Sequence, residues 1–270
     1  MRVGSIDGAN FPALGTAVVL AALPLHQASG EDVPASGVFG KAALPDASGS
    51  EVQFTASIWA DNWFALYVNG ELVAEDSVPI TTMRSFNSDI VTFRASYPLT
   101  IAVQTKDFIE NDSGLEYIGS LFGLVPIGSW FTLTQQIGDG GFIAQIKETE
   151  TDQLVAVTSS DWRGYVVHKA PLNPDCEKSR QPLVDCQSLI VEEPAGWYAA
   201  GFDDGAWVQA TTYTKQEIGA RFGYNDVDWD PSAHLIWTDD IDADNTILWR
   251  HQVGEPSATS PDTPTAAAHP

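Results

Sequence analysis

A short β-hairpin signal is the sequence feature that most constrains the fold. Trp63 to Val68 (WFALYV) is rich in aromatic and β-branched residues, and Asn69-Gly70 and the run Glu71 to Val73 follow it. Asn-Gly supplies the two positive φ values of a type I′ turn, whose twist matches that of the flanking strands. The sequence therefore predicts two antiparallel strands here, and with them a domain built on β-sheet.

Further short runs with strand character are separated by clusters of glycine, proline, asparagine and aspartate. They are Glu51 to Trp59, Ile90 to Arg94, Leu99 to Thr105, Trp130 to Gln136, Phe142 to Lys147, Leu154 to Thr158 and Tyr165 to His168. The long connection from Asp107 to Trp130 is expected to hold one short helix. Many short strands at this spacing predict an all-β, antiparallel β-sandwich with long loop insertions, or a barrel.

The formal net charge of −23 comes from 36 acidic and 13 basic side chains among 270 residues. Because binding to a phosphate backbone needs clustered Lys and Arg, this charge argues against nucleic acid as a partner. Such acidity is typical of solubility in a salty or calcium-rich medium, and cation or mineral binding is the alternative. Both readings suit an extracellular protein.

The two ends of the chain are expected to lie outside the sandwich domain, which we place at 30–253. Residues 1–29 contain the apolar run Leu14 to Leu25 followed by Ala28-Ser29-Gly30, as in a secretory signal peptide. This run is too short to cross a bilayer, and a buried strand or a truncated leader are alternatives. Residues 254–270 form a Pro/Thr/Ser/Ala tail that we expect to be disordered. The protein is thus expected to be secreted or to lie at the cell surface.

Two cysteines, Cys176 and Cys186, enclose nine residues. A pinned surface loop in an oxidising compartment explains this pair best, because the spacing and the lack of an intervening histidine do not suit zinc. Asn111-Asp112-Ser113 is an N-glycosylation sequon, which has meaning only in a secreted eukaryotic protein. The sequence therefore predicts one disulfide and one candidate glycosylation site.

Several segments, in consistent order, resemble the galactose-binding-like (discoidin-type jelly-roll) domain family. They are ADNWFALYVNGELV (60–73), LTIAVQTKD (99–107), GGFIAQIKE (140–148), LVAVTSSDWRGY (154–165), GWYAAGFDDGAWVQA (196–210) and HLIWTDDIDADNTILWR (234–250). The resemblance implies a jelly-roll sandwich. It also implies a range of roles, from binding galactose, other sugars, phospholipid headgroups or proteins to serving as a spacer.

Tryptophans beside polar residues are the candidate ligand contacts, because sugar rings stack on exposed indoles while amides and carboxylates bind the hydroxyls. Most of the nine tryptophans must belong to the core, and we expect Trp63 and Trp229 to be the exposed ones. Asp61, Asn62 and Asn225 are the polar candidates. For Asp61 and Asn62 the alternative is structural, with their side chains holding the hairpin.

A cluster of aspartates is the candidate metal site, since calcium takes six to eight oxygen ligands. Its members are Asp226, Asp228, Asp230, Asp240, Asp242 and Asp244. Neither run is an EF-hand, because Trp237 and His251 stand where the bidentate glutamate would be needed. A loop-type Ca²⁺ site and a solvated acidic loop both stay open.

No nucleophile elbow, zinc-protease motif or phosphate-binding glycine loop occurs in the sequence. A glycan-active hydrolase stays open, because its two carboxylates follow no fixed sequence spacing. The expected function is a secreted, non-catalytic, lectin-like carbohydrate-binding module, stabilised by calcium. The alternative is a structural subunit of a cell-surface or extracellular filament or matrix, which would self-assemble through protein contacts.

Overall fold

The computed structural model describes residues 50–80, 86–107, 112–118 and 134–255. The predictions for the leader, the Asn111 sequon and the tail beyond Glu255 lie outside these residues. The chain divides into two units, Met1–Asp46 and Ala47–Pro270, and the described residues all belong to the second unit.

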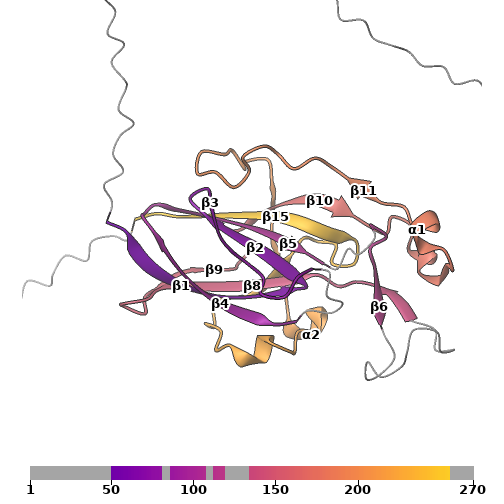
Figure 1. Ribbon diagram of the computed structural model, residues 1–270, viewed down its shortest axis with the longest axis horizontal. Coiled ribbons are helices and arrows are strands. Elements are labelled where there is room, and N and C mark those ends of the chain that lie inside the picture. The colour runs from indigo at the N-terminus through magenta and orange to yellow at the C-terminus, as the bar shows by residue number, and fades with distance from the viewer. Residues whose placement is uncertain (1–49, 81–85, 108–111, 119–133, 256–270) are drawn as a thin grey trace, which may run out of the picture. The chain divides into compact units, whose positions relative to one another are not determined.

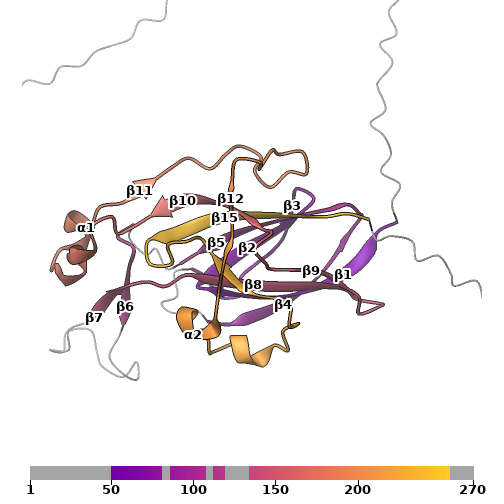
Figure 2. The same ribbon diagram turned by 180° about the vertical axis from the view of Figure 1, so that it is seen from behind.

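Two antiparallel sheets make up most of this unit (Figures 1 and 2). Sheet A has the strand order β13-β14-β8-β1-β4, with β9 also paired to β8, and sheet B has the order β11-β10-β15-β5-β2-β3, with β12 also paired to β10. Sheet A comprises β1 (Val52–Asp61), β4 (Ser88–Ala95), β8 (Gly141–Glu148), β9 (Leu154–Val157), β13 (Thr211–Tyr213) and β14 (Leu235–Trp237). Sheet B comprises β2 (Trp63–Val68), β3 (Glu71–Glu75), β5 (Leu99–Lys106), β10 (Arg163–Lys169), β11 (Leu189–Ile190), β12 (Val208–Gln209) and β15 (Asp244–Val253).

Smaller elements complete the described part of the chain. They are the two-stranded ribbon of β6 (Leu115–Ile118) and β7 (Thr134–Ile137), the α-helical turns α1 (Pro182–Asp185) and α2 (Lys215–Ile218), and 3-10 turns at Pro174–Lys178 and Tyr224–Asp226. Where the structure describes the predicted long connection after Asp107, it contains the strand β6 and not a helix. Among the described residues, no helix is long and apolar enough to cross a membrane.

The main core lies between the two sheets. Alternate residues of each strand point inward, as the period of two in a β-strand requires. The inward side chains include Phe54 and Ile58 of sheet A and Phe64, Val103 and Trp249 of sheet B, all fully buried. The all-β antiparallel sandwich is therefore confirmed, and the two sheets do not close into a barrel.

Both sheets also carry apolar residues on their outer faces. Trp59 and Ile143 of sheet A pack against Ile218 and Leu235, while Ala102 and Leu248 of sheet B pack against a cluster of covering aromatic side chains. Figures 1 and 2 show α2 beside sheet A and the chain between β11 and β12 beside sheet B. Six tryptophans are buried in these clusters and the core: Trp59, Trp162, Trp197, Trp207, Trp237 and Trp249.

The predicted hairpin is confirmed. β2 and β3 are paired, and the turn between them has φ of 52° at Asn69 and 93° at Gly70, as a type I′ turn requires. The Asn69 side chain accepts from the Thr100 N–H (2.7 Å) and donates to the Ser96 carbonyl (2.9 Å). The turn residue that the strands require is thus also a link to β5.

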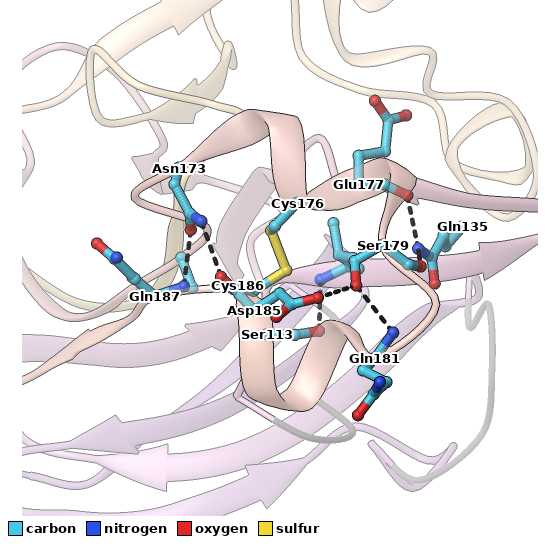
Figure 3. The surroundings of a disulfide bond; sticks show 12 residues. Ser113, Gln135, Asn173, Cys176, Glu177, Ser179, Gln181, Asp185, Cys186 and Gln187 are labelled. Atoms are coloured by element: carbon cyan, nitrogen blue, oxygen red, sulfur yellow. Dashed lines mark hydrogen bonds between the residues drawn. A yellow bond between two sulfur atoms is a disulfide. The ribbon is translucent and has the colours of Figure 1, made fainter.

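The predicted disulfide is confirmed as well, with the Cα atoms of Cys176 and Cys186 5.2 Å apart (Figure 3). Asn173, which precedes the loop, supports its base, since its side chain donates to the Asp185 carbonyl (2.8 Å) and accepts from the Gln187 N–H (2.7 Å). The disulfide therefore closes a locally hydrogen-bonded loop that contains α1.

The connection from β3 to β4 carries a buried carboxyl group, that of Asp76. Its Oδ1 accepts from the Val78 N–H (2.8 Å) and from the Asn87 amide (3.2 Å), which also donates to Asp89 (2.9 Å). Burial raises the pKa of Asp76 to about 6; the hydrogen bonds from Val78 and Asn87 oppose this rise, and the charge of Asp89 adds to it. Asp76 therefore holds its proton in the folded chain to a higher pH than an exposed aspartate does.

Removal of the disulfide should destabilise the fold. The Cys176→Ala/Cys186→Ala variant should lose about 2 to 3 kcal/mol, because the unfolded chain regains the entropy of the open loop. Urea denaturation measures this loss, and reduced wild type should match the variant. A variant as stable as the oxidised wild type would contradict the assignment.

The Asp76 carboxyl should make stability depend on pH. Its folded pKa of about 6 exceeds its ordinary value of 3.8, so its contribution is complete below pH 3.8 and is lost as the pH rises through 6. The stability of Asp76→Asn relative to wild type should therefore rise by about 1 to 3 kcal/mol between pH 4 and 7. Urea denaturation across this range measures the difference, and a constant difference would refute it.

Candidate functional site

A pocket of about 180 Å³ opens where the outer cover of sheet A meets the end of β1. It is lined by Trp59, Asp61, Phe86, Gly219, Arg221 and Phe222. Trp59 and Asp61 come from β1, Phe86 precedes β4, and the last three follow α2. Three separate stretches of chain thus build the site.

Local sequence explains how the loop after α2 reaches this position. Thr214 and Glu217 form a reciprocal capping box that begins α2. Beyond the helix, the Trp59 indole donates to the Phe222 carbonyl (2.9 Å). Gly223 is required next, because a Cβ there would lie 2.2 Å from the Phe86 carbonyl oxygen. The main chain around Phe222 is therefore held on both sides.

The pocket combines an apolar wall with two opposite charges. Phe222 is 74% exposed although its main chain is anchored, and Arg221 is exposed beside it. Asp61 is buried and accepts from the Asn62 amide (2.8 Å). An exposed ring next to a carboxylate and a guanidinium can hold a small ligand that has an apolar face and hydroxyl groups.

Two other hollows in the described part of the chain lack this combination. One, of about 340 Å³, is lined by Ile137, Lys169, Pro171, Leu172, Pro174, Asp240, Asp242 and Ala243, with no aromatic ring. Another, of about 300 Å³, is lined by polar and charged residues alone: Asp161, Arg163, Asp204, Arg250, His251 and Gln252. The pocket at Phe222 is therefore the candidate binding site.

Of the residues predicted to contact a ligand, Asp61 lines this pocket. Asn62 is fully buried and donates to the Asp61 carboxylate, a contact between the two side chains and not the hairpin-holding role that was the alternative for both. Phe222, Arg221 and Phe86 were not predicted. The one local signal for Phe222 was an aromatic residue set between arginine and glycine in a polar stretch.

The structure does not bring Trp63 and Trp229 together. Trp63 alternates with the inward Phe64 and so lies on the outer face of sheet B, where the Lys106 ammonium is 5.1 Å from its ring centre. Trp229 packs into the cover of sheet A and donates to the Tyr224 carbonyl (2.9 Å). Both are half-buried, whereas the other six tryptophans in the described part of the chain are buried, so these two are the partly exposed ones, as expected, but neither is fully exposed.

In the first predicted metal-binding run, Asp226 to Asp230, one carboxylate already accepts hydrogen bonds from a neighbouring residue. Asp230 accepts from the Ser232 N–H (2.9 Å) and hydroxyl (2.5 Å), and the adjacent Asn225, which was predicted as a ligand contact, accepts from the Lys215 ammonium. Asp226 and Asp228 are not buried. Within the described residues, none of these aspartates belongs to a set of three potential metal ligands whose ligand atoms lie within 4.8 Å of one another.

A lysine side chain from β10 already pairs with the second aspartate run. The Lys169 ammonium lies 2.8 Å from Asp240 and 2.9 Å from the buried Asp244, while Asp242 is exposed. Although burial alone would lower the pKa of Lys169, the two carboxylates raise it. Lysine thus occupies the place between Asp240 and Asp244, and calcium binding by either run stays a prediction.

The Lys169 ion pairs should contribute to stability. Lys169→Met should cost about 1 to 3 kcal/mol, because it leaves the buried carboxylate of Asp244 without its cation. The control Lys147→Met removes only an exposed pair with Asp152 and should change stability by less than about 0.5 kcal/mol. Equal effects of the two variants in urea denaturation would contradict this account.

Comparison with protein-family models, curated proteins and solved structures found no match for this chain. The galactose-binding-like resemblance therefore stays a prediction, and the function has to be argued from the geometry of the pocket.

Proposed function

We propose that this chain is a secreted, non-catalytic carbohydrate-binding module that holds a sugar in the pocket at Phe222. The observation that carries the proposal is the exposed ring of Phe222 beside Asp61 and Arg221. A pyranose has an apolar face of C–H groups, which stacks on an aromatic ring, and hydroxyls that bind charged side chains. The jelly-roll type of the sandwich is part of the proposal.

The pocket favours binding over hydrolysis. Glycoside hydrolysis in most families requires two carboxyl groups that flank the bond to be broken. Among the described residues that line the pocket, Asp61 supplies the one carboxylate. A binding role needs no second acid.

The disulfide supports secretion, because such bonds persist mainly in oxidising compartments. The net charge of −23 disfavours anionic sugars, since the field of the whole chain repels them. Neutral hexoses and their oligomers are therefore the ligand class that we propose.

One observation favours the alternative of a structural subunit. Apolar side chains are exposed around the disulfide loop and along β11, with Leu183, Val184, Leu189 and Ile190 each more than half exposed. Contiguous exposed apolar surface is typical of protein contacts. If this apolar surface serves assembly, the chain should form oligomers, and Leu183→Glu should disrupt them. Sugar binding at Phe222 requires no oligomer.

A glycan array probed with Phe222→Ala tests the proposed function. Loss of the stacking ring should weaken binding to neutral glycans about tenfold, the equivalent of about 1.4 kcal/mol. Arg221→Ala should weaken it as well, since a hydrogen-bond donor is lost. Leu72→Ala, an exposed apolar residue of sheet B, is the matched control and should bind as wild type does.

Two outcomes would contradict the proposal. One is the absence of any glycan binding by folded wild type. The other is wild-type binding by Phe222→Ala together with a loss in Trp63→Ala, which would move the site to the outer face of sheet B.

A further inference from the structure

A row of polar residues closes one end of the sandwich interior. Asn62, Asp107 and Asn245 lie opposite one another on β2, β5 and β15 or just beyond their ends: the Asn62 N–H donates to the Lys106 carbonyl (2.8 Å), and the Asp107 N–H to the Asn245 carbonyl (2.7 Å). By the period of two, they extend the inward columns of Phe64, Thr105 and Ile247. All three are at most 1% exposed. Polar groups thus stand where the interior is otherwise almost entirely apolar.

Two further carboxyl groups meet this row. Asp61 at the end of β1 and Glu116 of β6 join Asp107, and one oxygen from each of the three lies within 4.8 Å of the others. All three residues are less than a tenth exposed. Since Ca²⁺ binds oxygens at about 2.3 to 2.6 Å, two ligands of one ion can be no more than about 5 Å apart. The spacing therefore fits a single coordination sphere.

Asn245 supplies an independent observation. Its amide nitrogen donates to the carbonyls of Ala170 (2.5 Å) and Ala243 (3.0 Å), which fixes the orientation of the amide. Its Oδ1 is fully buried and has no hydrogen-bond partner. The residue directly faces Asp107 on the same side of the sheet, and a buried amide oxygen without a partner is costly unless something binds it.

We infer that Asp61, Asp107, Glu116 and Asn245 form a binding site for a divalent cation, and that the cation is Ca²⁺. All four donors are oxygens, which suit calcium and not the softer transition metals. Neighbouring amides hold two of the carboxylates in place: Asn62 donates to Asp61 (2.8 Å) and Gln136 donates to Glu116 (3.1 Å). The ion links β1, β5, β6 and β15, and so attaches the β6-β7 ribbon to the sandwich.

This site is separate from both aspartate runs between Asp226 and Asp244. It adjoins the pocket at Phe222 through Asp61, which lines the pocket and belongs to the carboxylate group. A dependence of sugar binding on calcium would follow and would rest on the proposed function. The cation site itself does not depend on it.

Calorimetric titration of the chelator-treated full chain with CaCl₂ tests the inference. Wild type should bind one ion and gain thermal stability as it does so. Glu116→Gln keeps the size of the side chain and its contact with Gln136 but removes a charge, and it should weaken binding about tenfold or more. Asp228→Asn, an acid of the neighbouring run, is the matched control and should bind as wild type does.

The inference would be overturned if the wild-type protein does not bind Ca²⁺. It would also be overturned if folded Glu116→Gln binds Ca²⁺ as tightly as wild type does. If Glu116→Gln does not fold, wild-type crystals grown with TbCl₃ decide the location. An anomalous peak between Asp107 and Glu116 supports the site, and a peak only at Asp226 to Asp230 overturns it. A chain that binds calcium here but no glycan would sink the sugar pocket and leave the cation site intact.

Discussion

Each sheet of this sandwich carries apolar side chains on both faces, and this constraint determines where the rest of the chain must run. The inward faces bury each other. The outward faces, with Trp59 on sheet A and Leu248 on sheet B, need covers of their own. Arg250 holds the cover of sheet B, because its buried guanidinium binds Asp204 (2.8 Å) and the carbonyl of Ala199 (3.1 Å). The long stretches after β11 and β13 are therefore structural covers.

The candidate functional features arise where this apolar packing stops. The pocket at Phe222 forms at the margin of the cover of sheet A, where the loop after α2 is fixed by Trp59 and Gly223. The carboxylate group around Asp107 forms where the inward columns of sheet B run out. Asp61 belongs to both, so the two features share one end of β1.

Local chemistry explains what could be predicted from the sequence. Asn69-Gly70 determines its own turn, and two cysteines allow one intramolecular pairing, so the hairpin and the disulfide followed directly. Alternation predicted the strands and the sandwich but not the face on which Trp63 would lie. Strand spacing carried no signal for the ribbon of β6, which pairs with a strand across a long connection.

Partners far apart in the chain explain what could not be predicted. Phe222 lines a pocket only because its loop docks on Trp59, 163 residues away. The sequence marks Asp240 and Asp244 as calcium ligands but gives no sign that the fold places the Lys169 ammonium between them. Asp107 and Asn245 meet through the register of β5 and β15, and Glu116 joins Asp107 from the separate β6-β7 ribbon, an arrangement that no local pattern encodes.

An NMR titration of the ¹⁵N-labelled chain with galactose, the sugar that the family resemblance names, would show where on the folded protein a sugar binds. If the pocket at Phe222 binds the sugar, the Trp59 indole N–H and the amides from Gly219 to Gly223 should show saturable shifts. Shifts confined to Trp63 and Lys106, or to the disulfide loop, would contradict it.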